Sequence, residues 1–192
     1  MKKIIILLIF TFGICFGQND KEVNTRFLIQ GGYEFGGEKI GYVFFDDGSE
    51  KSIKAGNGVY FGMGAEFDII KAKGLFIRSL LSYKVESIAA SNVSVRYTSL
   101  PLEFTLNYNA SNKFWFGGGF TLYNAIKLNF DGLAPNEKFN SAIGPVFKMG
   151  YGAIGISYTA LKIKPKNYDE KFSASNFGIF VIIPLPKKDW KK

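Results

Sequence analysis

The chain has 192 residues, 47% of them hydrophobic and 21% charged, which is typical of one folded domain and excludes a disordered or coiled-coil protein. It contains no histidine and one cysteine, which excludes a Ser-His-Asp triad, a Cys-His dyad and an ordinary zinc site. The formal net charge is +8, but all except three of the 24 basic residues are dispersed lysines, so we expect no nucleic-acid partner.

Residues 1–17 are expected to be a cleaved signal peptide that exports the chain. Lys2 and Lys3 precede an apolar run that ends at Phe16 and is too short to span a bilayer. Cleavage after Gly17 leaves a mature chain without cysteine, which starts with a short N-terminal segment, residues 18–23. A buried N-terminal element is the alternative. Lipidation at Cys15 is disfavoured, because that signal needs a small residue where the chain has Ile14.

Residues 24–185 are expected to form the folded domain, because apolar side chains alternate there with polar or small ones. The 20 Phe, 10 Tyr and 22 Gly of the chain also favour strands and tight turns. Segment 75–86 fits helical spacing as well, but both of its neighbours alternate, which favours a strand. One apolar face is expected along the whole of segment 114–130, Ile126 and Leu128 included. The predicted strands are 24–35, 58–69, 75–86, 98–108, 114–130, 139–151, 153–163 and 173–185.

Short and long connections alternate between these eight segments, which places all the short turns and both termini at one end. That layout predicts an all-β fold, an eight-stranded antiparallel up-and-down transmembrane β-barrel, followed by a basic C-terminal tail at residues 186–192. The long connection from Gly36 to Asn57 contains Ile40, Tyr42 and Phe44, which suggests an extension of the first hairpin beyond the membrane.

The apolar face of the predicted strands is almost free of charge, as a lipid-facing wall should be, because a charge at the bilayer midplane costs about 2–4 kcal/mol. Five aromatic residues are expected beside the short turns, as an interfacial girdle: Tyr108, Phe114, Phe116, Phe147 and Tyr151. The alternative is a soluble barrel or sandwich in which these residues are ordinary core aromatics.

The other face is expected to fill the lumen, since eight strands enclose only enough room for side chains. Tyr60, Lys84, Trp115 and Tyr123 are the predicted lumen-filling residues. A turn centred near Ala72 sets Arg78 opposite Glu66, and a loop centred between residues 90 and 91 sets Arg78 opposite Glu103. We therefore expect a structural charge cluster of these three residues, with Gly117 opposite Glu103 leaving space for it. Such a barrel conducts no solutes.

Two adjacent strands carry a family resemblance. The stretch Tyr97–Tyr108 (YTSLPLEFTLNY), followed by Lys113–Gly119 (KFWFGGG), resembles the small outer-membrane β-barrel family of Gram-negative bacteria, with PorT-like and OmpA- or OmpX-like members. The resemblance implies a barrel in the cell outer membrane, in contact with outer-membrane lipid and inserted by the barrel-assembly machinery. Its PorT-like members point to an envelope protein partner as one possibility. The last strand departs from the family by ending in Ile183-Pro184-Leu185 instead of an aromatic residue.

We expect no enzymatic activity and no cofactor or metal. The chain has no histidine and no Gly-x-Ser-x-Gly elbow, and the pair Ser82 and Lys84 fits lumen filling better than catalysis. Three functions stay open at this point. They are a structural or interaction barrel that acts through its outer loops, an accessory subunit of a secretion or envelope-assembly system, and a soluble lipocalin-like binder of an apolar ligand.

Overall fold

A computed structural model describes residues 25–45, 48–69, 73–89, 94–111, 113–130 and 135–185. The expected signal peptide, the segment 18–23 and the basic tail 186–192 lie outside the described residues. Within the described ranges, no helix is long and apolar enough to cross a membrane.

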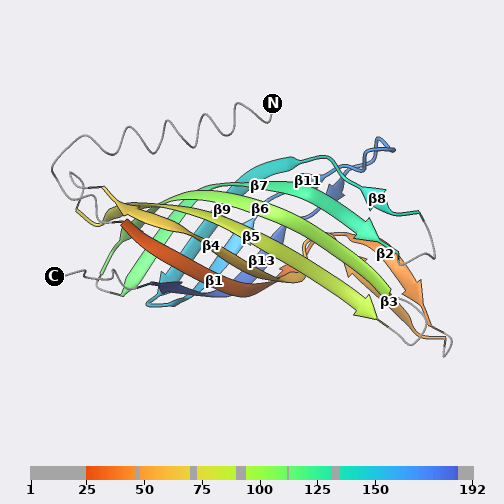
Figure 1. The fold of residues 1–192 in the computed structure, drawn as a ribbon, viewed down its shortest axis with the longest axis horizontal. Helices are drawn as coiled ribbons and strands as arrows, with labels where there is room; N and C mark the ends of the chain where they lie inside the picture. Colours follow the sequence, from red (N-terminus) through yellow and green to blue (C-terminus); the bar gives the residue numbers. More distant parts are fainter. Residues whose placement is uncertain are drawn as a thin grey trace, which may run out of the picture.

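Eight antiparallel strands of the described chain close into a barrel (Figure 1). They run around the ring in chain order, β13 pairs with β1, and the pairing of β6 with β7 completes the closure. The short β8 (Glu137–Lys138) adds to the edge of β7. The predicted up-and-down barrel is therefore confirmed. Its strands are β1 (Thr25–Gly36), β4 (Gly58–Asp68), β5 (Leu75–Ala89), β6 (Ser94–Asn109), β7 (Phe114–Asn129), β9 (Ala142–Tyr151), β10 (Ile154–Thr159) and β13 (Asn176–Pro184).

The period-two alternation of the sequence becomes an apolar outer wall and an inner wall of mixed polar and apolar side chains. Leu28, Gln30 and Glu34 of β1 are buried inside, whereas Phe27 and Tyr33 on the other face of the strand point outward and are exposed. The ambiguous segment 75–86 is indeed a strand, since it lies within β5 and pairs along its length with β4 and β6.

The expectation of one apolar outer face along all of β7 is wrong. A bulge shifts the β6–β7 register between Thr98 and Leu100, where Ala125 has a positive φ of 51°. The extra residue reverses the alternation beyond it. Ile126 and Leu128 therefore point inward and are buried, while Lys127 is exposed on the outside.

The short turns meet at one end of the barrel, which we call the turn end. Backbone hydrogen bonds join them: Asn109 N donates to Gly74 O over 2.8 Å, and Gly152 N donates to Lys113 O over 2.7 Å. Ile182 N of the last strand donates to Ala153 O over 2.8 Å. The first residues of β1 and the last of β13 lie at this same end, as the alternation of connection lengths predicts.

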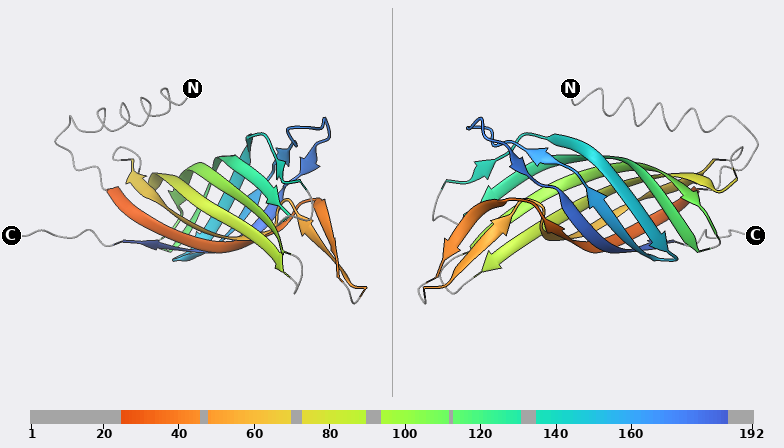
Figure 2. Two further views of the ribbon diagram at one scale, coloured as in Figure 1. Left: turned by 45° about the vertical axis from the view of Figure 1, so that its right-hand side comes forward. Right: turned by 180° about the vertical axis from the view of Figure 1, so that it is seen from behind.

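The long connections carry their own short strands at the opposite end, the loop end (Figures 1 and 2). The hairpin of β2 (Lys39–Phe44) and β3 (Glu50–Lys54) follows β1, and the hairpin of β11 (Lys162–Ile163) and β12 (Phe172–Ser173) precedes β13. Glu38 N donates to Ser173 O over 2.7 Å, and Asn140 N donates to Lys164 O over 2.9 Å. These bonds tie three connections together across the mouth of the barrel.

A hydrophobic core lies beneath these connections, and we call the connections with this core the lid. The side chains come from the three connections and from the loop-end halves of β6 and β7. The β7 bulge contributes to the lid directly, because it turns Ile126 and Leu128 inward. The buried members are Val43, Ile53, Ala55, Val95, Tyr97, Tyr123, Ile126, Leu128, Phe139, Leu161, Ile163 and Ala174.

Candidate functional site

The interior on the turn-end side of the lid is a series of buried ion pairs, and the first lies nearest the turns. The structure places Glu66 on β4 directly opposite Arg78 on β5, and Arg78 Nε donates to Glu66 Oε2 over 2.7 Å. Arg26 of β1 contacts the other oxygen of the same carboxylate and lies 3.2 Å from Asp68 Oδ1. One buried carboxylate thus serves two guanidinium groups.

The expected contact between Arg78 and Glu103 is wrong. In the β5–β6 register, Arg78 lies opposite Thr105, and Glu103 lies opposite Leu80. The expected position of Gly117 is wrong as well, because Asn107 is its neighbour on β6, while Glu103 lies opposite Thr121. The β5–β6 and β6–β7 hairpins are both centred farther along the chain than the sequence suggested. The offset of the β5–β6 hairpin separates Glu103 from Arg78.

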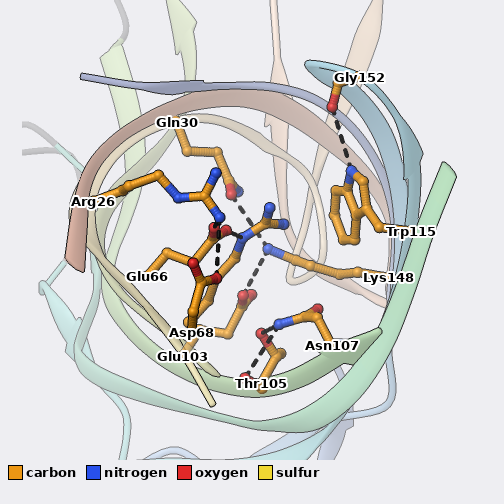
Figure 3. A network of polar contacts seen from close by, with 11 residues as sticks. Arg26, Gln30, Glu66, Asp68, Glu103, Thr105, Asn107, Trp115, Lys148 and Gly152 are labelled. Atoms are coloured by element: carbon orange, nitrogen blue, oxygen red, sulfur yellow. Dashed lines mark hydrogen bonds and ion pairs between the residues drawn. The ribbon is translucent and has the colours of Figure 1, made fainter. Parts of the chain in front are cut away.

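Lys148 of β9 takes the place that Arg78 was expected to fill beside Glu103. Its Nζ lies 2.7 Å from Glu103 Oε1 and 3.4 Å from Gln30 Oε1. Gln30 Nε2 in turn donates to the hydroxyl of Tyr60 over 2.8 Å. This second group spans the lumen from β9 to β1 and β6, as Figure 3 shows for Gln30, Glu103 and Lys148.

The third ion pair lies next to the lid. Lys84 of β5 is fully buried, and its Nζ lies 2.5 Å from Glu34 Oε2 and 2.7 Å from Gly56 O. The Tyr123 hydroxyl donates to the same Glu34 oxygen over 3.1 Å. The space between this pair and the second group is about 20 Å³, which is room for about one water molecule.

All four predicted lumen-filling residues point inward and are buried, with Trp115 3% exposed and Tyr60 6% exposed. Glycines on neighbouring strands make room for the large rings. A Cβ on Gly150 would lie 2.6 Å from the Trp115 ring, and one on Gly155 would lie 2.4 Å from the Phe180 ring. The glycine-rich strands are therefore a packing requirement of a narrow, ring-filled lumen.

A larger cavity of about 770 Å³ opens at the turn end, and we call it the turn-end cavity. Its inner wall is formed by Trp115, Phe76 and Arg78, and its rim by the turns around Lys73 and Lys113. Figure 3 shows Arg26 and Glu66 projecting into the barrel from one side and Trp115 from the opposite side. The Trp115 indole is fixed by a 3.3 Å hydrogen bond from Nε1 to Gly152 O. No group of three His, Cys, Asp or Glu residues among the described residues is arranged to hold a metal ion.

The five expected interfacial aromatics all point outward and are exposed. Tyr108, Phe114, Phe116 and Tyr151 lie at strand ends beside the turns, and the rings of Tyr108 and Phe116 are 5.8 Å apart. Phe147 lies farther from the turns, opposite Tyr158 of β10.

A second outward aromatic group was not anticipated from the sequence. Phe177 stacks on Phe35 with ring centroids 6.1 Å apart and contacts Tyr158 at 4.8 Å, toward the loop end. Arg26, Glu34 and Lys148 were also missed as lumen residues. Alternation within β1 contained the signal for Arg26 and Glu34, which share the inward face with Gln30.

Comparison with known proteins gives structural similarity and little more. No protein-family model matches the chain, and no curated protein sequence matches it. The attachment invasion locus protein Ail of Yersinia pestis, solved with the heparin analogue sucrose octasulfate, aligns over 85% of this chain and 100% of its own, at 9% identity and a TM-score of 0.48. The outer membrane protein AlkL in DMPC bilayers aligns over 89% of this chain and 96% of its own, at 10% identity and a TM-score of 0.38.

The translocator domain of the autotransporter NalP from Neisseria meningitidis aligns over 93% of this chain and 68% of its own, at 14% identity and a TM-score of 0.38. At such identities the sequences carry no functional correspondence. The barrel assignment rests on the closed strand order described above.

Proposed function

We propose that this chain is an outer-membrane β-barrel with a side-chain-filled lumen, which acts as a structural or interaction barrel through its outer connections. The observation that carries the proposal is the outer wall. Its exposed positions on all eight barrel strands are apolar or uncharged between the aromatic groups near the two ends. A water-soluble barrel of this size would expose charges there, whereas a bilayer requires the reverse.

The two charges that face outward on these barrel strands support the same assignment. Arg96 and Lys127 are exposed, and both lie in the loop-end halves of β6 and β7, beyond the apolar belt. The wall thus changes from apolar to charged where a membrane surface is expected. The soluble lipocalin-like alternative needs apolar residues inside and charges outside, so the exposure pattern disfavours it.

The lid supports an interaction role at the loop end. Its hairpins are joined by backbone hydrogen bonds and packed on a buried core. They therefore present one fixed surface instead of several independent loops. An envelope protein partner and a PorT-like accessory role in secretion are finer versions of this proposal.

Cysteine labelling on cells tests location and orientation together. We replace Glu50 of the β2–β3 hairpin or Ala110 of the β6–β7 turn with cysteine, since both side chains are exposed. A membrane-impermeant maleimide is expected to label Glu50→Cys on intact cells, and Ala110→Cys only after the outer membrane is permeabilised. Recovery of the mature chain in the soluble fraction would overturn the proposal, and labelling of Ala110→Cys alone on intact cells would reverse the orientation.

A further inference from the structure

We propose that the turn-end cavity binds a small organic anion that joins one carboxylate or phosphate group to an apolar body. The site lies at the opposite end of the barrel from the lid and is independent of any partner that the lid contacts.

The charge balance of the cavity favours an anion. Its lining contains three cationic side chains, Arg26, Lys73 and Arg78, and one carboxylate, Glu66. Lys113 also lines the rim, but its ammonium lies over the outward-facing ring of Tyr151. Asp68 lies beside Arg26 and adds a second carboxylate at the edge. The three cations and two carboxylates leave one positive charge without a counterpart in the described part of the cavity.

Arg78 presents an unused donor to the cavity. Its side chain is 9% exposed, and its Nε is engaged by Glu66. The guanidinium lies 4.1 Å from the Trp115 ring centroid and 4.7 Å from that of Phe76, which fixes its plane. Nη1 is buried and has no hydrogen-bond partner among the described residues. Buried donors are nearly always paired in native proteins, and an acceptor from a ligand in the cavity would pair this one.

Arg26 repeats this arrangement on β1, which lies on the other side of β4 from β5. One of its nitrogens contacts Glu66 and Asp68, while Nε is buried without a partner in the described chain. Two guanidinium groups that share one carboxylate therefore converge from β1 and β5 on the same space. Guanidinium geometry suits the planar or tetrahedral oxygens of a carboxylate or phosphate.

The remaining walls suit an apolar body of limited size. Leu28, Trp115 and Ile182 line the cavity deeper than the lysines of the rim, and each is buried. The volume of about 770 Å³ lies within the ~300–1,000 Å³ typical of small-molecule sites. The second ion-pair group and the lid close the other side, so the ligand must enter and leave at the turn end.

Trp115 supplies a direct readout of binding. The chain contains two tryptophans, Trp115 and Trp190, so Trp190→Phe leaves Trp115 as the sole reporter. The purified full chain in detergent is titrated with benzoate, with phenyl phosphate and, as the neutral match, with benzamide. A saturable change in Trp115 emission is expected with one or both anions and not with benzamide, and the stronger of the two identifies the preferred oxyanion.

Three substitutions in this background test the assigned residues. Arg78→Met is expected to weaken anion binding roughly ten- to hundredfold, the value of a charge-assisted hydrogen bond. Glu66→Gln is expected to strengthen it, because the anion then replaces the lost carboxylate. Arg96→Met is the matched control, because this exposed arginine lies near the loop end, and it is expected to leave the affinity for the anion unchanged. The heat-dependent gel shift verifies that each variant is folded.

If Arg78→Met does not fold, Glu66→Gln and the exposed rim variant Lys73→Met, which is expected to weaken binding, still decide the question. Equal responses to benzamide and the anions, or no saturable response at all, would overturn the proposal. Unchanged or weaker anion binding in folded Glu66→Gln would show that the anion does not compete with Glu66 for the two arginines, and would overturn the site as assigned.

Discussion

At the residue scale, the three buried ion-pair groups differ in what remains when one member is removed. Lys84→Met leaves the Glu34 carboxylate with the Tyr123 hydroxyl as its remaining partner among the described residues. Losing one partner of a buried pair costs about 3–5 kcal/mol. Arg78→Met leaves Arg26 beside Glu66 and is expected to cost less. Lys84→Met should therefore lower the temperature of the folded-to-unfolded gel shift more than Arg78→Met does.

Adding Glu34→Gln to Lys84→Met removes the uncompensated charge and should restore part of the lost heat resistance. Lys162→Met, an exposed lysine of β11, controls for the loss of a lysine as such. A Lys84→Met barrel as heat-resistant as the parent would show that water reaches Glu34 and screens it.

At the element scale, the bulge in β7 is what joins the lid to the barrel. Deleting Ala125 would restore simple alternation, which turns Ile126 and Leu128 outward and Lys127 into the lid core. The lid should then lose its packing while the turn-end half of the barrel keeps its register. Limited proteolysis of the purified protein should show new cleavage in the β2–β3 and β11–β12 hairpins.

Ala125→Gly is the matched control for this deletion, because glycine adopts the positive φ of this position without strain. It should be as protease-resistant as the parent or more so. Hairpins that stay intact in the deletion variant would mean that the lid does not depend on the two inward side chains.

The β7 bulge also marks a point where the sequence alone does not predict which face of a strand a residue occupies. Strand positions and faces were predictable on β1, β4 and β5 because a lipid-facing wall and a filled lumen enforce strict alternation. Ile126 and Leu128 are apolar and suit either the lipid or the lid core, so the sequence contains no sign that they changed sides.

The Arg78–Glu66 pairing was predictable because a short turn determines its register. The pairing of Glu103 with Lys148 joins β6 to β9 across the intervening β7, and the registers of both β6–β7 and β7–β9 decide it.

At the scale of the whole molecule, the barrel is closed at one end and open at the other. Three barriers follow one another from the turn-end cavity to the loop end: the Lys148–Glu103 group, the Lys84–Glu34 pair with Tyr123, and the hydrophobic core of the lid. An ion entering from the turn end would have to displace two buried ion pairs and then cross apolar packing. Each step carries a desolvation penalty.

Planar-bilayer recordings of the purified protein should consequently show no large, steady open-state current, with heat-dependent mobility verifying that the inserted protein is folded. Replacing both Lys84 and Tyr123 with alanine removes the second barrier and enlarges the 20 Å³ space, yet the lid still covers it, so this variant should also fail to conduct. Steady current in the double variant alone would locate the seal at Lys84 and Tyr123 and show that the lid leaks. Steady current in the parent would mean that the buried pairs line a conducting path instead of closing it.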